Sequence, residues 1–350
     1  MKVLVTGGAG YLGSVLVPKL VARGHQVRVV DLGYFGVSRL RSTRPPIEII
    51  HDDLRRIVDS PSRIQEVLDG CQSVIHLAAI SNDPSAELRP ELTREVNFTA
   101  TARLADACRH QGVRFLFSSS CSIYGSSPSE ASETSPVNPI TVYAESKVDA
   151  ERALTELADN SWRPVILRNG TLFGYSSRMR FDLVVNIFSL YSTIHNKIKI
   201  FGNGEQWRPF LHVADCAAAF LHFVEARESK HLCYNIATEN LRVVDLAKIF
   251  KNMNALLHVE HVELQDPDLR DYAVSTQRMR EAGFRPRFDV QTGAELLVES
   301  IVSGLIPDPE SSFYRNAKWL KELTNIGDDD HRRITGLMET MTHLVAVGRA

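Results

Sequence analysis

A glycine-rich turn near the start of the chain constrains the fold more than any other feature. Glycines stand at positions 7, 10 and 13, directly after the short β-branched apolar run 3–5. Apolar residues then recur at helical spacing as far as Leu20, and Gly24 is a suitable C-terminal glycine for that helix. A strand, a tight turn and a helix in this order are typical of the first βαβ unit of a parallel α/β sheet.

The alternation of strands and helices continues to about residue 170. Further strands are predicted over 26–31, 47–50, 73–77, 114–118 and 164–168, with helices over 61–68, 90–111 and 142–157. We therefore expect a doubly wound Rossmann domain over residues 1–170, with later segments near 205–230 interleaved. A smaller α/β substrate-binding lobe over 171–305 and a tail over 306–350, expected to be a peripheral helix, complete the prediction.

Composition narrows the class of protein. The formal net charge of −2, without a long basic block, predicts no nucleic-acid partner and no membrane surface. The longest apolar stretches stay below the roughly 18 residues of a membrane span. Five cysteines without a Cys-x-x-Cys pair argue against a disulfide framework and a zinc site, and no other cluster has ligand spacing, so we expect no metal. A cytoplasmic enzyme for a small ligand fits best.

The glycine turn and Asp31 together predict a dinucleotide site. Residues without side chains let the backbone approach a pyrophosphate, whose charge then lies at the helix N-terminus. Asp31 stands 18 residues after Gly13, at the end of the second strand, where a carboxylate accepts hydrogen bonds from ribose hydroxyls. The same carboxylate repels a 2′-phosphate, so we expect NAD rather than NADP. Two alternatives stay open: Arg39 reverses that preference, or the turn holds no ligand.

Tyr143 and Lys147 are the candidate catalytic pair. A spacing of four places both side chains on one helical face, and a neighbouring ammonium is expected to lower the pKa of the phenol toward neutrality. Ser118, Ser119 and Ser120 end the fifth strand, at the sheet edge where such folds bind ligands, and Ser120 can donate to the same substrate oxygen. The alternative is an ordinary amphipathic helix pair beside a polar strand end.

With these residues in view, the sequence resembles the extended short-chain dehydrogenase/reductases, in their nucleotide-sugar epimerase and dehydratase branch. The resemblance covers residues 1 to about 300 through TGGAGYLG at 6–13, HLAA at 76–79, FSSSCSIYG at 117–125, YAESK at 143–147 and WRPFLHVAD at 207–215. It implies NAD as cofactor and Tyr143 as the general acid/base, with Lys147 and Ser120 as its partners. The implied cofactor residues are Gly7, Gly10, Tyr11, Leu12, Gly13, Asp31, Asp53, Leu54, Leu77, Ala78, Ala79, Asn97, Ser118, Tyr143 and Lys147.

The same resemblance implies a nucleotide-diphosphate sugar as substrate. Its contacts would come from Ser120, Asn169, Thr171, Arg208 and Arg270, with the two arginines at the diphosphate. The family's 4,6-dehydratases carry an Asp-Glu pair after the serine or threonine, where this chain has Cys121 and Ser122, so dehydration by that mechanism is disfavoured. Many relatives also place an asparagine three residues after the arginine of the sixth strand, where this chain has Thr171.

An epimerase that acts through a transient keto-sugar is therefore the leading expectation. A ketoreductase or dehydrogenase, a dehydratase and a decarboxylase share its first step and stay open as alternatives. A regulator that senses the dinucleotide without chemistry is the alternative from a different class; the intact Ser120, Tyr143 and Lys147 argue against it.

A homodimer is expected from two apolar helix stripes. One stripe contains Val96, Ala100, Leu104 and Ala107, and the other contains Val148, Ala150, Ala153, Leu154 and Leu157. Two such helices from each subunit would pair as a four-helix bundle with two-fold symmetry. The alternative is that both stripes cover the sheet.

Overall fold

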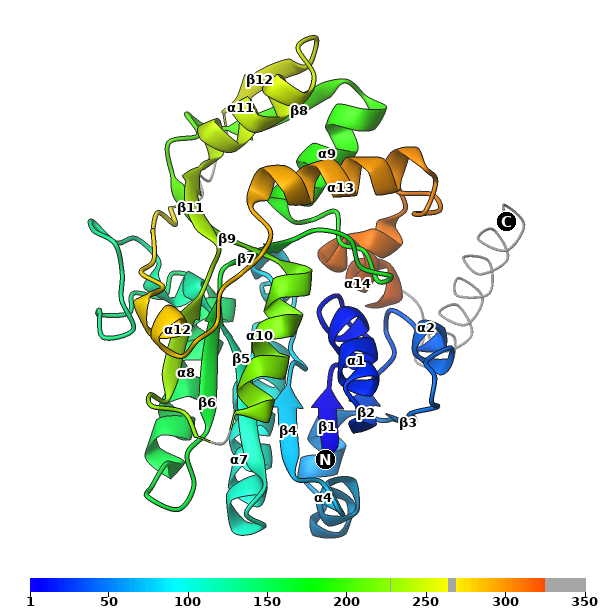
Figure 1. Cartoon of the computed structure of the whole chain (residues 1–350), viewed down its shortest axis with the longest axis vertical. Helices are drawn as coiled ribbons and strands as arrows, with labels where there is room; N and C mark the ends of the chain where they lie inside the picture. The colour runs from blue at the N-terminus through cyan, green and yellow to red at the C-terminus, as the bar shows by residue number, and fades with distance from the viewer. Residues whose placement is uncertain (227, 264–268, 325–350) are drawn as a thin grey trace.

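The predicted parallel sheet is present and has seven strands in the order β3-β2-β1-β4-β5-β6-β10 (Figure 1). The computed structural model describes residues 1–226, 228–263 and 269–324. The strands are β1 (Lys2–Thr6), β2 (Gln26–Asp31), β3 (Glu48–His51), β4 (Ser73–His76), β5 (Arg114–Ser120), β6 (Val165–Asn169) and β10 (Cys233–Ile236), and all neighbours are parallel. The strand order reverses between β1 and β4, and folds of this kind bind ligands at that point, outside the carboxyl ends of the strands.

Helices cover both faces of the sheet, as the doubly wound prediction requires (Figure 1). On one face, α1 (Gly13–Ala22) packs against α10 (Val213–Glu225), and their apolar side chains join one core cluster. On the other face lie α3 (Leu54–Val58), α4 (Pro61–Leu68), α7 (Ala100–His110) and α8 (Val142–Leu157). The short α2 (Ser38–Arg41) packs beside α1, and α5 (Asp83–Ala86) lies in the connection after β4. A strand covered on both sides is buried throughout, which explains why every residue of β4 is buried.

The helix expected over 90–111 is interrupted. It consists of α6 (Pro90–Arg94), a π-helical turn (Glu95–Thr99) and α7. The wider turn aims the buried Asn97 at the segment that follows β4, where its carboxamide accepts from the Ile80 backbone N–H (2.8 Å) and donates to the Ile80 carbonyl (3.0 Å). Turns of this kind are common at functional sites.

The two apolar stripes lie mainly against the sheet. Ala100 and Leu104 of α7, with Ala150 and Leu154 of α8, are buried in the core cluster on that face. The outward surfaces of the two helices carry charged side chains such as the exposed Arg103 and Arg152. The sheet-covering alternative therefore accounts for these four residues, and the homodimer stays a prediction.

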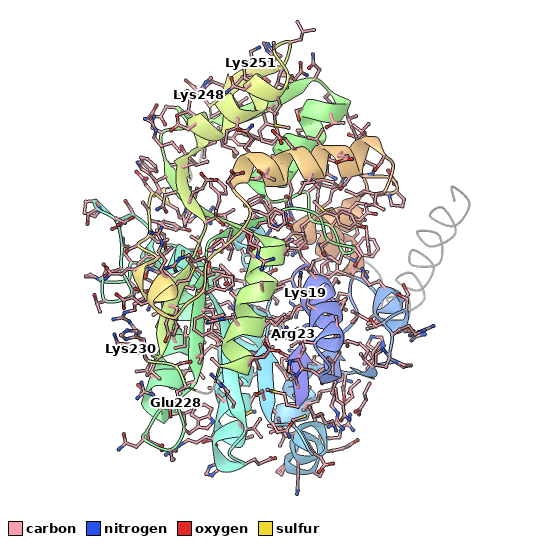
Figure 2. All side chains as sticks on the ribbon, in the orientation of Figure 1. Lys19, Arg23, Glu228, Lys230, Lys248 and Lys251 are labelled. Carbon is pink, nitrogen blue, oxygen red and sulfur yellow. The ribbon has the colours of Figure 1, made fainter. Side chains whose placement is uncertain are left out.

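The lobe is built from two small sheets. One has the order β11-β9-β7, with β7 (Thr171–Phe173), β9 (Trp207–His212) and β11 (Glu239–Arg242), and the other pairs β8 (Lys197–Phe201) with β12 (His258–Val262). The helices α9 (Val184–Ile194), α11 (Val243–Met253) and α13 (Val290–Val302) enclose its core, and α12 (Gln277–Glu281) packs near β10. Lys248 and Lys251 mark the outer face of α11 in Figure 2. After β9 the chain returns to the Rossmann domain through helix α10 and strand β10, which joins the main sheet. Residues 207–212, which form β9, are paired in a lobe sheet, whereas the interleaved segment was expected near 205–230.

The described part of the C-terminal tail is not peripheral. Residues 312–314 form a 3-10 turn and α14 spans Asn316–Thr324. Phe313, Tyr314, Trp319 and Leu323 are buried in the same core cluster as α1 and α10. The expectation of a peripheral helix is therefore wrong for residues 306–324, because these aromatic side chains complete the core; residues 325–350 lie outside the described residues. Within the described ranges, no helix has the length and apolar character needed to cross a bilayer.

Candidate active site

The glycine turn lies at the switch point of the sheet and leaves no room for side chains. Gly7 has φ +71°, and a Cβ on it would lie 2.7 Å from the backbone nitrogen of Ala78, just after β4. A Cβ on Gly13 would lie 2.4 Å from the Gly8 carbonyl oxygen. The first position of α1 is capped by no side chain, since Leu12 occupies the N-cap. A diphosphate can therefore approach this helix end closely, as predicted for a dinucleotide site.

Asp31 is joined to the glycine turn. Its carboxylate accepts hydrogen bonds from the backbone N–H groups of Ala9 (2.9 Å) and Gly33 (2.8 Å), while burial raises its pKa. Arg39, the residue that could have favoured NADP, donates to the Phe35 carbonyl oxygen at 2.9 Å. Asp53 caps α3 by accepting from the Arg55 N–H at 2.9 Å. Asp31 therefore shapes the turn as well as offering an acceptor to a ribose.

The segment after β4 is fixed from two sides. Ala78 N–H donates to the Thr6 hydroxyl over 3.3 Å, and Leu77 N–H to the Thr6 carbonyl over 3.0 Å. Besides its bonds to Ile80, Asn97 donates to the Ser146 hydroxyl of α8 at 3.1 Å. Asn97 thus acts inside the protein, as a positioning residue between the Leu77–Ala79 segment and the helix that carries Tyr143.

The three predicted catalytic side chains come together at the carboxyl end of β5. Ser120 lies close enough to Tyr143 to lower the pKa of the phenol, and Ser120 Oγ accepts from the Ser122 N–H at 3.1 Å. Lys147 Nζ lies 5.7 Å from the centre of the Tyr143 ring and donates to the Ser118 carbonyl over 2.9 Å. Helix α8 supplies two of the groups and β5 the third, so their meeting depends on how the helix packs on the sheet.

The expected depression of the Tyr143 pKa is not observed. Burial raises the pKa of Tyr143 to about 12, and the Asp83 carboxylate adds to the effect, while the Ser120 hydrogen bond, Arg180 and Arg270 oppose it. Burial also lowers the pKa of Lys147 to about 7. The prediction considered only the neighbouring ammonium, but desolvation of both groups is the larger effect in this closed site.

The predicted substrate residues lie around this cluster. Asn169 donates to the Ser118 hydroxyl at 3.0 Å, below the strand ends, and the half-buried Thr171 begins β7. Arg208 is buried on β9 and donates to the carbonyl oxygens of Trp207 (2.8 Å) and Arg270. The structure therefore brings the two arginines side by side.

Arg270 also reaches the Rossmann domain. It forms an ion pair with Asp83, and the same carboxylate accepts from the hydroxyl of Thr141, the N-cap residue of α8, at 2.6 Å. The lobe and the catalytic helix are thus linked through one carboxylate.

Sequence reasoning missed Asp83 and a charged segment before α9. Arg180 and Asp182 form a buried ion pair at 2.9 Å, and Arg180 exerts a charge effect on both Tyr11 and Tyr143. The segment is linked to the glycine turn through Asn186, whose side-chain nitrogen donates to the Tyr11 hydroxyl at 3.1 Å and to the Arg180 carbonyl oxygen at 2.8 Å. The sequence feature that could have revealed this segment is the run of charged residues at alternate positions 178, 180 and 182, within a stretch bordered by apolar residues.

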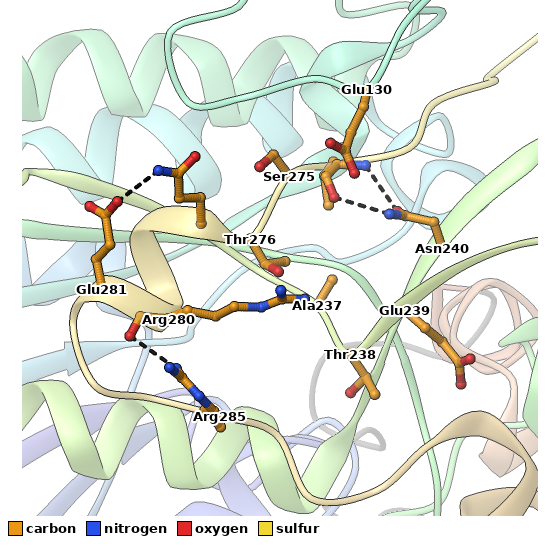
Figure 3. A pocket seen from close by; sticks show the side chains of 12 residues that line it. Glu130, Ala237, Thr238, Glu239, Asn240, Ser275, Thr276, Arg280, Glu281 and Arg285 are labelled. Carbon is orange, nitrogen blue, oxygen red and sulfur yellow. Dashed lines mark hydrogen bonds between the residues drawn. The ribbon is translucent and has the colours of Figure 1, made fainter.

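A separate pocket opens beside β10 and α12. It has a volume of about 680 Å³ and is lined by residues 237–240, 274–277, 280, 281 and 285 and by Glu130 (Figure 3). It contains none of the predicted catalytic or cofactor residues. Among the described residues, no cluster of histidine, cysteine or carboxylate side chains has the makings of a metal site.

Comparison with known proteins identifies the family. The model of the NAD dependent epimerase/dehydratase family matches residues 3–237, which is most of the chain. The chain belongs to this family. Membership makes it an enzyme of an NAD-dependent family, and the residues at the switch point fit that cofactor: an unobstructed turn, an open helix end and a carboxylate at the end of β2.

Relatives of this NAD-dependent family member act on nucleotide-sugars, but not all catalyse one reaction. UDP-glucuronic acid decarboxylase 2 from Arabidopsis thaliana is 26% identical over 315 residues, covering 85% of this chain and 68% of the relative. The structure of MoeE5 in complex with UDP-glucose and NAD is 27% identical, with a TM-score of 0.73 and coverage of 87% and 100%. UDP-glucose 4-epimerase from Thermotoga maritima, solved with UDP-glucose, is 25% identical, with a TM-score of 0.77 and coverage of 87% and 100%.

Proposed function

We propose that the chain is a nucleotide-sugar epimerase that oxidises one sugar hydroxyl to a transient ketone and then reduces it from the opposite face. The observation that carries the proposal is the Ser120–Tyr143–Lys147 cluster next to residues that cannot carry out an elimination. Cys121 is buried with its thiol directed at the Arg168 carbonyl (3.1 Å), and burial raises its pKa. Ser122 is buried too. Neither supplies the acid and base that water loss requires.

The proton and the hydride have separate destinations in this reaction. When bound, NAD would supply the acceptor, and later the donor, of the hydride at the sugar carbon. Tyr143 takes the hydroxyl proton of the same carbon as a phenolate, the form that Ser120, Arg180 and Arg270 favour against burial, and it gives the proton back when the ketone is reduced. Ser120 is placed to hold the sugar oxygen beside Tyr143, because its hydroxyl lies near enough to the phenol to lower the pKa of Tyr143. Lys147, fixed on Ser118, positions Tyr143 and offers a charge to the cofactor's ribose.

The nucleotide diphosphate is assigned to the two adjacent arginines. Guanidinium groups bind phosphate oxygens through paired, charge-assisted hydrogen bonds. Arg208 and Arg270 lie side by side at the junction of lobe and Rossmann domain, and the link from Arg270 through Asp83 to the start of α8 connects this end to the catalytic helix. The sugar would then extend from the arginines toward Tyr143.

A decarboxylase is the second candidate. Relatives with this activity on UDP-glucuronic acid are 25–26% identical to the chain. Arg180 and Arg270 both act electrostatically on Tyr143, and a uronate carboxylate could bind them only in competition with Asp182 and Asp83, their ion-pair partners. Its first step is the same oxidation, after which the β-keto acid loses carbon dioxide, the carbon that carried the carboxylate takes up a proton, and the returned hydride reduces the ketone again.

A panel of UDP-sugars separates these reactions. NAD-loaded protein is incubated with UDP-glucose, UDP-galactose, UDP-N-acetylglucosamine and UDP-glucuronic acid, and the products are followed by NMR, mass spectrometry and absorbance of reduced cofactor. The epimerase predicts a product of unchanged mass and inverted configuration, with no net reduced cofactor. Loss of carbon dioxide from UDP-glucuronic acid alone identifies the decarboxylase, and stoichiometric change of cofactor identifies a dehydrogenase. Binding without any conversion identifies a sensor and refutes the proposal.

A further inference from the structure

Residues 311–324, here called the C-terminal strap, contact three separate segments that border the cofactor site. In Figure 1 the strap's helix α14 lies near the carboxyl ends of the central strands. The bordering segments are residues 33–37 after β2, residues 80–82 after β4, and residues 178–182 before α9. We propose that the C-terminal strap completes the cofactor site and keeps NAD bound through successive turnovers.

The strap first holds the loop that follows Asp31. Trp319 donates from its indole nitrogen to the Tyr34 carbonyl at 2.7 Å, and Phe313 packs edge-on against Phe35 with ring centres 6.3 Å apart. The loop starts at Gly33, whose N–H bonds the Asp31 carboxylate. In a Rossmann fold this carboxylate binds the adenosine ribose. Movement of the loop away from the ribose therefore requires Trp319 and Phe313 to separate from it.

Asn316 joins the other two segments through one side chain and its backbone. Its amide nitrogen donates to the Ser81 hydroxyl at 3.2 Å, and its backbone N–H donates to the Asp182 carboxylate at 3.2 Å. Its side-chain oxygen accepts from the guanidinium of Arg178. Asn316 is 5% exposed, so these bonds are made away from water. Ser81 follows the cofactor-lining Leu77–Ala79 segment, and Asp182 holds Arg180 next to Tyr11 and Tyr143.

The buried Arg178 depends on the strap for one of its few hydrogen-bond acceptors, the side-chain oxygen of Asn316. Its side chain is 1% exposed, its guanidinium lies 3.6 Å from the centre of the Phe35 ring, and its Nε has no hydrogen-bond partner among the described residues. The guanidinium bonds Asn316 and the Met179 carbonyl oxygen (2.9 Å). A buried cation with so few acceptors is costly to leave unpaired. Removing the Asn316 acceptor should therefore loosen both Arg178 and the Phe35 loop beneath it.

The expected consequence is slow exchange of the cofactor. The strap fastens the loop at the adenosine end and the segments at the middle of the site, so NAD leaves only when these contacts open together. Retention suits a reaction that regenerates its cofactor in every cycle. The inference rests on NAD binding by the family and not on which sugar reaction follows, so it stands or falls independently of the epimerase proposal.

Dissociation of NAD from the full chain tests the strap directly. Protein loaded with radiolabelled NAD is chased with excess unlabelled NAD, without sugar, and the label that remains bound is followed with time. Asn316→Ala removes the side-chain hydrogen bonds to Ser81 and Arg178. Trp319→Phe keeps an aromatic ring but removes the indole N–H that donates to the Tyr34 carbonyl oxygen. We expect dissociation to become faster by about tenfold or more in Asn316→Ala and about 3- to 10-fold in Trp319→Phe. Lys318→Ala, at an exposed position of the same helix, is the control and should behave as wild type.

A split between kinetic parameters distinguishes cofactor retention from a general loss of structure. In the folded variants, the NAD concentration for half-maximal activity should rise while kcat at saturating NAD stays within about twofold of wild type. Variants with a wild-type Tm and a wild-type rate of NAD dissociation would overturn the proposal. A lowered kcat with unchanged NAD dissociation would also overturn it, since the strap would then act on the sugar site. If Asn316→Ala does not fold, Trp319→Phe decides by the same criteria.

Discussion

Lys147 Nζ donates a hydrogen bond to the Ser118 carbonyl oxygen over 2.9 Å, and this bond fastens helix α8 to the end of strand β5. Tyr143 lies one helical turn before Lys147, and Ser120 lies two residues beyond Ser118 on the strand. The bond therefore sets the distance between the phenol and the serine hydroxyl that must share one substrate oxygen. The same arrangement removes the Lys147 ammonium from water, and this burial lowers the pKa of Lys147 to about 7.

Tyr143→Phe should retain NAD and lose turnover. The variant keeps the ring on α8 but removes the oxygen that receives the sugar proton, so we expect kcat to fall by a factor on the order of 10² to 10⁴. Steady-state rates with the substrate found in the UDP-sugar panel measure the effect. Tyr191→Phe, on the lobe helix α9, is the matched control and should leave turnover unchanged. Turnover of Tyr143→Phe within a few-fold of wild type would contradict the assignment.

Asp31→Asn should weaken NAD binding and relax discrimination against NADP. The amide keeps the size of the side chain, but it removes the charge that repels a 2′-phosphate and weakens the bonds to Ala9 and Gly33. Loss of a charged hydrogen-bond acceptor corresponds to roughly 10- to 100-fold in affinity for NAD. Calorimetric titration of wild type and variant with both dinucleotides gives the comparison. A wild-type protein that already prefers NADP would show that Asp31 has been misinterpreted.

Glu151→Ala should destabilise the protein strongly. Glu151 and Arg168 form a buried ion pair at 2.6 Å between α8 and β6, with both side chains 9% exposed. Removing one partner leaves an uncompensated buried charge, which costs about 3–5 kcal/mol of unfolding free energy. Glu145, also on α8, forms an exposed ion pair with Arg94 of α6; Glu145→Ala breaks this pair and should change stability by less than about 1 kcal/mol. Urea unfolding of both variants tests this, and equal effects would contradict the distinction.

His76 should make stability depend on pH below neutrality. The ring is buried between the hydroxyls of Thr6 (2.6 Å) and Thr101 (2.8 Å), and burial lowers its pKa from 6.5 to about 3. The unfolded chain then binds a proton on His76 below pH 6.5 that the folded chain does not bind until about pH 3. Stability is therefore lost as pH falls through this window, with a slope of about 1.4 kcal/mol per pH unit from this group.

His76→Gln isolates that contribution, because glutamine does not titrate. Between pH 6.5 and pH 5 the free energy of unfolding of the wild type should fall more steeply than that of the variant, whatever the variant's own stability. Identical slopes would show that His76 protonates as readily in the folded protein as in the unfolded one.

The homodimer awaits measurement of the mass in solution. Light scattering coupled to size exclusion should give twice the chain mass of 39.2 kDa at micromolar concentration. A charge reversal at Arg103, on the outward face of α7, should weaken the dimer without unfolding the chain, because its side chain is 55% exposed. A monomer mass for the wild-type protein would refute the prediction.

Local sequence patterns were sufficient to predict those parts of the structure that depend only on residues close together in the chain. Glycines at 7 and 13 are required by close approaches within the turn and to Ala78, and the apolar runs of β1 and β4 follow from burial on both faces. The spacing of Tyr143 and Lys147 places them one turn apart in any helix. These features need only backbone geometry and hydrophobic periodicity, so the doubly wound fold could be predicted.

Tertiary structure alone decided the properties that depend on distant neighbours. Burial, supplied by both domains, sets the pKa of Tyr143 near 12 and reverses the expectation from Lys147 alone. The apolar residues of α7 and α8 suit a sheet or a partner equally well, and only packing showed that Leu104 faces the sheet. Asn316 and Ser81 are 235 residues apart in sequence, yet they are hydrogen-bonded beside the cofactor site. The sequence by itself determined the turn, the helix face and the alternation of strands and helices along the chain because these are local, whereas electrostatic environment and long-range contacts exist only once the chain has folded.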